Sequence, residues 1–208
     1  MTLAQLPFSS DPKPLRWTVD AYDRMAAAGL FNQARVELIE GRIIQMAAQL
    51  EPHVAGVSLA GKVLESAFGG GYWVRRQNPL RFGSRSKPEP DVAVVPGNEG
   101  DYIDIGTPST ALLVVEVSDS SLRYDRGRKA ALYAKHAIAD YWIVNLVERQ
   151  LEVHRDPVPN PAGRFKFRYA QIQVLKPGDA IAPISIDSPV SVSSLMPRLP
   201  QKQMPTTD

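Results

Sequence analysis

A short apolar run near the middle of the chain restricts the fold more than any other feature. Residues 111–118 read ALLVVEVS, and Glu116 is the only charged residue among them. A run of this kind is typical of a central β-strand that is covered on both faces of its sheet. With the helices and hairpins expected around it, the run predicts an α/β (or α+β) domain built on a mixed, curved central sheet.

The other elements are expected in the order helix, hairpin, helix, strands, helix, hairpin and strands. Thr18 can cap a helix over residues 19–28, and the next segment predicts a hairpin that turns at Glu40 and Gly41. Later expected elements are helices over 51–68 and 124–136, strands over 72–82, 91–95, 111–117, 141–146, 150–155, 165–174 and 184–192, and loops over 96–109 and 156–163. Residues 1–16 and 196–208 are expected to be disordered, which leaves one domain over residues 17–195.

The composition excludes several classes of protein. The chain has no cysteine, which rules out disulfides and thiolate zinc sites and fits a cytoplasmic protein. It has no apolar run of about 18 residues, so we expect no transmembrane helix, and its first residues do not resemble a signal peptide.

The charge distribution does not by itself indicate a nucleic-acid-binding protein. The net charge is only +2, so the chain has no overall basic field. Two local basic clusters are more typical of a solvated surface than of a phosphate-binding track. Their members are Arg75, Arg76, Arg81, Arg85 and Lys87, and then Arg123, Arg126, Arg128 and Lys129.

Two carboxylates lie in or beside apolar strands. Asp91 begins the run DVAVV, and Glu116 lies within ALLVVEVS. On adjacent strands, about 4.7–4.9 Å apart, the two carboxylates would converge and repel each other by roughly 4 kcal/mol. A divalent ion with hard oxygen ligands, Mg²⁺ or Mn²⁺, would relieve that repulsion. The alternative is structural: Asp91 bonded to loop backbone at a strand entry, and Glu116 pointing off the sheet edge.

Three further residues are candidates for the same site. Lys129 lies four residues after Asp125, so it either forms a surface salt bridge or reaches back to the acidic pair. Glu37, in the first hairpin, is either a third acidic ligand or a solvent-facing strand residue. His53, at the start of a helix, is more typical of a cap or a surface. The sequence contains no His-zinc, serine-nucleophile or glycine-rich nucleotide motif, which argues against those sites.

Taken together, these segments resemble the Uma family of restriction endonucleases, a branch of the PD-(D/E)XK nuclease-like superfamily. The resemblance covers about residues 15–154. It rests on VELIEGRI, a helix headed by His53, PEPDVAVV, and LLVVEVSDSSLRYDRGRKAALYAKHAIADYWIVN. It implies a restriction-endonuclease-like fold, in which helices flank a mixed central sheet. It also implies Mg²⁺-dependent hydrolysis of DNA, with Mn²⁺ as a substitute, by a homodimer.

The resemblance also implies roles for individual residues. Asp91 matches the aspartate of the superfamily motif, Glu116 its following acid, and Glu37 the acid of the first motif, so all three are expected metal ligands. The lysine that usually stands two residues after the second acid is replaced by Ser118. Lys129 matches a lysine that has moved to the following helix, where it would activate the nucleophile or stabilise the phosphate. The rival hypothesis is an inactive nuclease fold that binds nucleic acid or protein.

Overall fold

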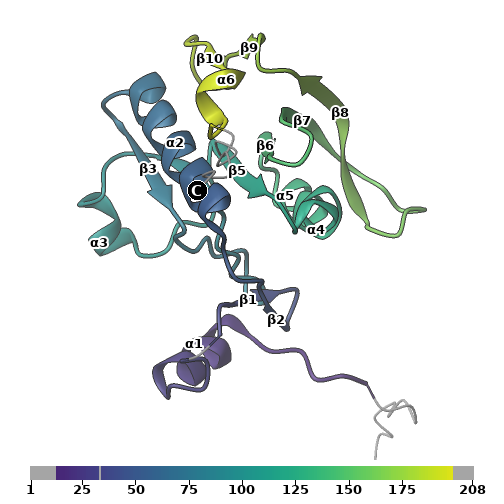
Figure 1. Cartoon of the computed structure of the whole chain (residues 1–208). Coiled ribbons are helices and arrows are strands. Elements are labelled where there is room, and N and C mark those ends of the chain that lie inside the picture. Colours follow the sequence, from purple (N-terminus) through teal and green to yellow (C-terminus); the bar gives the residue numbers. More distant parts are fainter. Residues whose placement is uncertain (1–12, 33, 199–208) are drawn as a thin grey trace, which may run out of the picture.

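A six-stranded sheet forms the centre of the computed structural model, which describes residues 13–32 and 34–198 (Figure 1). The strand order is β3-β4-β5-β6-β7-β8. These strands are β3 (Tyr72–Arg76), β4 (Val92–Pro96), β5 (Leu113–Ser118), β6 (Asp140–Asn145), β7 (Gln150–Pro159) and β8 (Phe167–Leu175). Strands β5 and β6 are parallel and every other neighbouring pair is antiparallel, so the predicted mixed sheet is confirmed.

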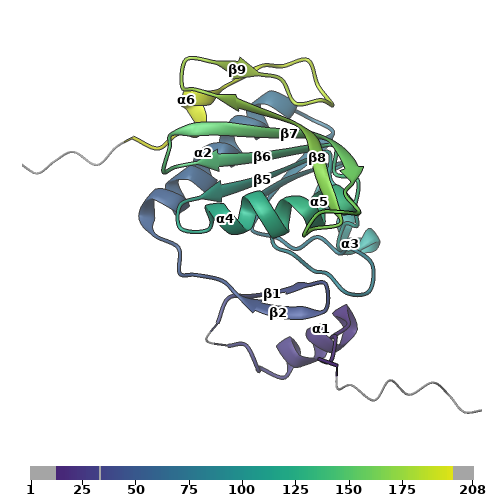
Figure 2. The same ribbon diagram turned by 90° about the vertical axis from the view of Figure 1, so that its right-hand side faces the viewer.

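Helices cover both faces of this sheet (Figure 2). One face packs against α2 (Glu51–Phe68) and the short α6 (Val192–Leu195). The other face packs against a continuous helical stretch composed of α4 (Leu122–Tyr124), the π-helical turn η1 (Asp125–Lys129) and α5 (Ala130–Lys135). Apolar side chains of β5 alternate between the two layers, with Val115 in the α2 cluster and Val114 in the α5 cluster. All residues of β5 are buried, as expected of a central strand.

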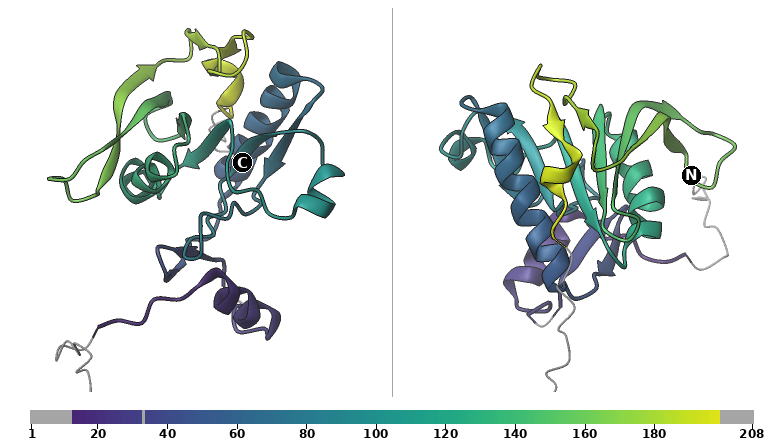
Figure 3. Two further views of the ribbon diagram at one scale, coloured as in Figure 1. Left: turned by 180° about the vertical axis from the view of Figure 1, so that it is seen from behind. Right: turned by 45° about the horizontal axis from the view of Figure 1, so that its top comes forward.

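A hairpin and a helix lie at one end of the sheet (Figure 3). They are α1 (Val19–Ala27), capped by Thr18 as predicted, and the antiparallel strands β1 (Val36–Ile39) and β2 (Arg42–Gln45). The turn between the strands consists of Glu40 (φ 50°) and Gly41 (φ 77°), the positive values that a tight two-residue hairpin needs. The backbone N–H of Lys87 donates to the carbonyl of Leu38, which ties the hairpin to the loop that follows β3.

Two strand predictions were too long. Strand β3 ends at Arg76 because Gln77 has a positive φ of 51°, outside the range of an extended chain. Only Val190–Ser191 (β10) of the expected strand 184–192 pairs, with β9 (Ala180–Ile181). The N–H of Ile184 instead donates to the side chain of Asp140, so it is not available for a sheet ladder.

Both expected loops contain regular structure. The loop over 96–109 includes α3 (Asp101–Ile105). Strand β7 continues to Pro159, although residues 156–163 were expected to form a proline-rich loop. Prolines are tolerated there because β6 ends its pairing at Arg155, so the remainder of β7 pairs with β8 alone and has one free edge.

Most of the two expected disordered ends lies outside the described residues, because residues 1–12 and 199–208 are not described. Within the described part of the chain, no helix is both long enough and apolar enough to cross a membrane.

Candidate functional site

The two acidic residues first singled out face each other across β4 and β5. Val92 pairs with Val115, so continuing the antiparallel register by one residue puts Asp91 opposite Glu116. Opposite residues project to the same face of a sheet, so the predicted convergence follows from the pairing. Both side chains are buried, Asp91 at 5% exposure and Glu116 at 4%.

Lys129 is buried between two carboxylates, at 1% exposure. Its Nζ atom donates to Glu37 Oε1 and to Glu116 Oε1, each over 3.0 Å. The interpretation of Lys129 as a surface salt-bridge residue is therefore wrong, and so is that of Glu37 as a solvent-facing residue. The three residues come from η1, β1 and β5, so only the folded chain brings them together.

Burial and nearby charges act in opposite directions on these groups. Burial alone would lower the pKa of Lys129, but the charges of Glu116 and Glu37 outweigh it and hold that pKa well above its ordinary value. Burial raises the pKa of Glu116 well above its ordinary value, and the charges of Asp91 and Asp125 add to this while Lys129 opposes it. One ammonium group therefore does not neutralise the acids around it.

Ser118, at the position of the usual lysine, has a different contact. Its hydroxyl donates to Asp125 Oδ2 over 2.7 Å, and the Tyr141 hydroxyl donates to the Asp125 carbonyl over 3.1 Å. Asp125 is the first residue of η1, and Lys129 is the last. Ser118 thus anchors the start of the turn that carries Lys129. Turns of the π type are frequent at functional sites.

Asp91 is held by the neighbouring strand and by α2. Its Oδ2 accepts the backbone N–H of Val117 over 2.9 Å, and its Oδ1 lies 3.1 Å from His53 Nε2. Burial lowers the pKa of His53, but the hydrogen bond and charge of Asp91 outweigh burial and raise it overall. His53 is therefore a partner of the acidic pair rather than a surface residue. The structural alternative for Asp91 was a contact with loop backbone, whereas the backbone donor is Val117 of the central strand β5.

A cavity of about 60 Å³ is lined by Glu37, His53, Asp91, Glu116 and Asp125, among others. One water needs roughly 10–15 Å³, so the cavity can hold an ion with a few waters. Sequence reasoning missed several of its residues. The carboxylates in its lining come from Glu37, Glu89, Asp91, Glu116, Asp119 and Asp125.

Two missed residues had a local signal, Glu89 in the cavity lining and Tyr133 behind Glu116. Glu89 lies two residues before Asp91, which is the spacing of side chains on one side of an extended chain. Tyr133 follows Lys129 by four residues, the spacing of one helix face, and its hydroxyl donates to Glu116 Oε1 over 2.6 Å.

The donor chemistry fits a hard divalent cation. All the acidic ligands are carboxylate oxygens, and Glu37 Oε2 is buried with no hydrogen bond, although it lies 2.9 Å from Lys129 Nζ. Over residues 13–32 and 34–198, no three His, Asp or Glu side chains form a ready ligand set. Mg²⁺ does not need one, because it keeps several waters and usually takes one or two carboxylates together with substrate phosphate. Asp91 and Glu116 meet that requirement.

Comparison with known proteins identifies a family and a similar fold. A family model named Uma2 and described as "Putative restriction endonuclease" matches residues 19–186. A crystal structure described as a putative nuclease belonging to DUF820, from Anabaena variabilis ATCC 29413, is similar, with a TM-score of 0.61 and 16% identity over 86% of this chain and 96% of that one. That likeness shows a shared fold. A search of curated proteins found no match.

Proposed function

The chain belongs to the Uma2 family of putative restriction endonucleases, and from this premise we propose that it is a metal-dependent endonuclease that hydrolyses DNA phosphodiester bonds. The observation that carries the proposal is the buried Lys129 amine, which lies between Glu37 and Glu116. Glu116 in turn lies opposite Asp91 in the register of β4 and β5. A lysine in direct contact with two carboxylates of the cavity lining belongs to a set of groups that can bind a cation and a phosphate together.

Asp91 and Glu116 would hold Mg²⁺ or Mn²⁺. Glu37 would become a further oxygen ligand once it moves away from Lys129 Nζ, which lies 3.0 and 2.9 Å from its two oxygens. Such an ion polarises a phosphoryl oxygen and lowers the pKa of a bound water. Of the two roles considered for Lys129, phosphate stabilisation is the better supported. An ammonium group with two carboxylates within 3.0 Å stays protonated, so it can stabilise negative charge but cannot accept a proton. His53 acts by orienting Asp91.

Ion binding is tested by thermal unfolding with and without Mg²⁺ or Mn²⁺. We expect the ion to raise the melting temperature of the wild type and of Asp104→Asn, a control at an exposed carboxylate on α3. Asp91→Ala should abolish the rise. A wild type that neither gains stability from the ion nor cleaves DNA would refute the proposal.

Hydrolysis is tested with single-stranded, duplex and branched DNA in the presence of the ion. Cleavage by the wild type that is lost in Glu116→Ala, with Asp104→Asn fully active, is the expected result. We also propose a homodimer, because two sites are needed to cut both strands, and sedimentation analysis of the purified chain measures this directly.

The second candidate function is an inactive nuclease fold that binds nucleic acid or protein. It is favoured by the position of Lys129, whose amine already occupies the point where Glu37 and Glu116 meet. This candidate predicts DNA binding with no metal-dependent stabilisation and no cleavage, so the same two experiments distinguish it from the nuclease.

A further inference from the structure

A strongly basic groove lies outside the acidic cavity, on the other side of the elements that carry Glu37 and Lys129. Its volume is about 470 Å³. It is bordered by the β1–β2 turn, by η1 and α5, and by the segment that enters β8 (Figure 2). The cations in its lining are Arg16, Arg42, Arg128, Lys135, Arg164 and Lys166, and its single acid is Glu40.

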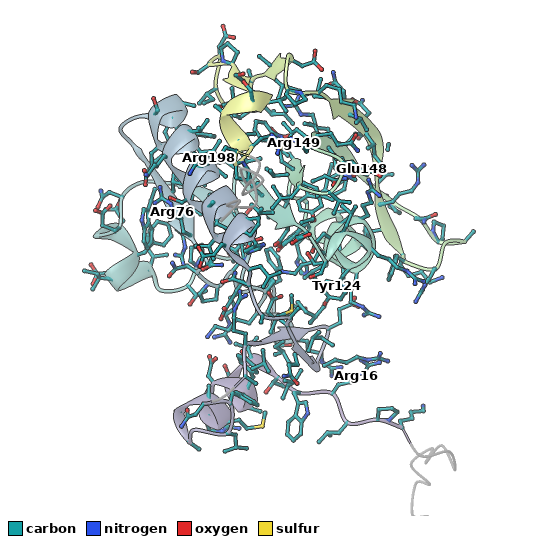
Figure 4. All side chains as sticks on the ribbon, viewed as in Figure 1. Arg16, Arg76, Tyr124, Glu148, Arg149 and Arg198 are labelled. Carbon is teal, nitrogen blue, oxygen red and sulfur yellow. The ribbon has the colours of Figure 1, made fainter. Side chains whose placement is uncertain are left out.

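Most of the positive charge in this groove is not paired with a carboxylate. Six cations and one carboxylate amount to a local charge of +5, compared with +2 for the whole chain. Glu40 is shared by Arg128 and Lys135, at 3.4 and 3.3 Å. Among the described residues, the other four cations form no ion pair with a carboxylate. Arg16, labelled in Figure 4, donates to the backbone carbonyl of Glu40 instead.

Most members of the two basic clusters that the sequence shows are instead paired with carboxylates. Arg81 pairs with Asp20 and Lys87 with Asp23. Arg126 pairs with both Glu148 and Glu152. The groove, which is assembled from four separate segments, therefore brings together four cations that have no carboxylate partner among the described residues.

An aromatic ring lies within the basic groove. The guanidinium carbons of Arg164 and Arg128 lie 5.4 and 5.9 Å from the centre of the Phe165 ring. Gly127 allows this packing, because a Cβ atom there would lie 3.2 Å from the ring. Cations beside a partly exposed aromatic ring are the combination that binds single-stranded nucleic acid, by contacts to phosphates and by stacking on a base.

We infer that this groove binds the backbone of single-stranded DNA. The bound segment would flank the phosphodiester bond that is hydrolysed at the acidic cavity. The inference rests on the proposed nuclease function and names where its substrate binds. Arg128 and Lys129 are adjacent in sequence, yet Arg128 lines the groove and Lys129 contacts Glu116, which lines the cavity. Arg35 lines the cavity and Glu40 lines the groove, and five strand residues span roughly 17 Å. That length corresponds to at most about five nucleotides, because 3.4 Å is the rise of a stacked strand in a duplex and an extended single strand covers more length per nucleotide.

The test measures binding without hydrolysis. Fluorescence anisotropy follows labelled oligo-dT of 4, 8 and 12 nucleotides in EDTA, for the wild type and for the triple variant Arg42→Gln, Arg164→Gln and Lys166→Gln. These three residues are exposed, so the variant should keep its fold, and circular dichroism checks this. The matched control is Lys62→Gln, at an exposed lysine on α2.

We expect wild-type affinity to rise between 4 and 12 nucleotides, and the triple variant to lose that rise. The slope of log affinity against log salt should decrease by about 2, since each phosphate contact on a single strand contributes about 0.7. Phe165→Leu should weaken binding of the 12-mer while leaving the salt slope unchanged. Asp104→Asn, at an exposed carboxylate that lines neither the groove nor the cavity, should bind like the wild type.

Three results would overturn the inference. The first is a triple variant that binds as the wild type does or that is no weaker than Lys62→Gln. The second is equal displacement of the 12-mer by poly-glutamate of the same charge, which would indicate a general anion surface. The third is tighter binding of a 12-base-pair duplex with no effect of Phe165→Leu. Cleavage by a triple variant that binds normally would reject the groove as the DNA-binding site and leave the nuclease proposal intact. Groove-dependent binding without cleavage would support the groove and reject the nuclease proposal.

Discussion

Replacing Lys129 with methionine is the sharpest test of the site geometry. Methionine is also a long unbranched side chain, so Lys129→Met removes the charge and leaves little cavity. The Nζ atom lies 3.0 Å from one oxygen of Glu37 and 3.0 Å from one of Glu116. The variant therefore leaves two buried carboxylates facing each other without a cation.

The expected loss of stability is about 3–5 kcal/mol. At an effective dielectric of 20, each contact at 3.0 Å has a gross attraction of roughly 5–6 kcal/mol. The cost of desolvating the three charges offsets much of this attraction, and measured losses on removing one partner of a buried pair are about 3–5 kcal/mol. For a domain of this size, that loss lowers the melting temperature by roughly 6–20 °C.

Urea unfolding at pH 7.5 measures the change, with Lys62→Met as the control for losing a surface lysine. The control should stay within about 0.5 kcal/mol of the wild type. Adding Glu37→Gln to Lys129→Met should recover part of the loss, because one of the stranded charges is then gone. A loss below about 1 kcal/mol in Lys129→Met would refute the reasoning, since it would mean that the lysine is not held between the acids.

Three further predictions concern the fold around the site. Leu64→Ala, at a fully buried residue of α2, should cost about 2–5 kcal/mol in urea unfolding, and a loss under 1 kcal/mol would contradict the packing of α2 on the sheet. Gly41→Ala should cost about 1–2 kcal/mol by thermal unfolding, because φ is 77° and the new Cβ would lie 2.9 Å from the Arg16 side chain; unchanged stability would argue against this turn. Hydrogen bonds from Arg126 and other donors outweigh burial and hold the pKa of Glu152 below its ordinary 4.5, so the stability gap between wild type and Glu152→Gln should be full above about pH 4.5 and shrink as the pH falls. A gap that is constant or grows in acid would be inconsistent with that shift.

The sequence alone determined the parts of the fold that depend on local patterns. The cap at Thr18 and the turn at Glu40–Gly41 could be predicted because capping and tight turns require particular residue types at particular positions. Helix α2 follows from three- and four-residue apolar spacing, and β5 follows from an almost unbroken apolar run. Local patterns failed where a remote contact decided the outcome, as when the backbone of Ile184 bonded to Asp140 rather than to a strand.

The candidate site was likewise predicted in part from the sequence and decided in part by the tertiary structure. The sequence identified Asp91, Glu116, Lys129 and Glu37 as charges in unusual positions, but left a structural alternative open for each. Only the register of β4 against β5, and the packing of η1 and the hairpin on that sheet, placed Lys129 Nζ at 3.0 Å from two acids. Periodicity reports which side chains share a face of one element. It does not report which faces of distant elements meet.

The clearest case is the basic groove. The clusters visible along the chain are largely neutralised by nearby acids such as Asp20 and Glu152. The groove takes its charge from residues as far apart as Arg16 and Lys166. Electrostatic fields depend on distance in space, so the sequence determined how many charges the chain carries, and the tertiary structure alone decided where they add and where they cancel.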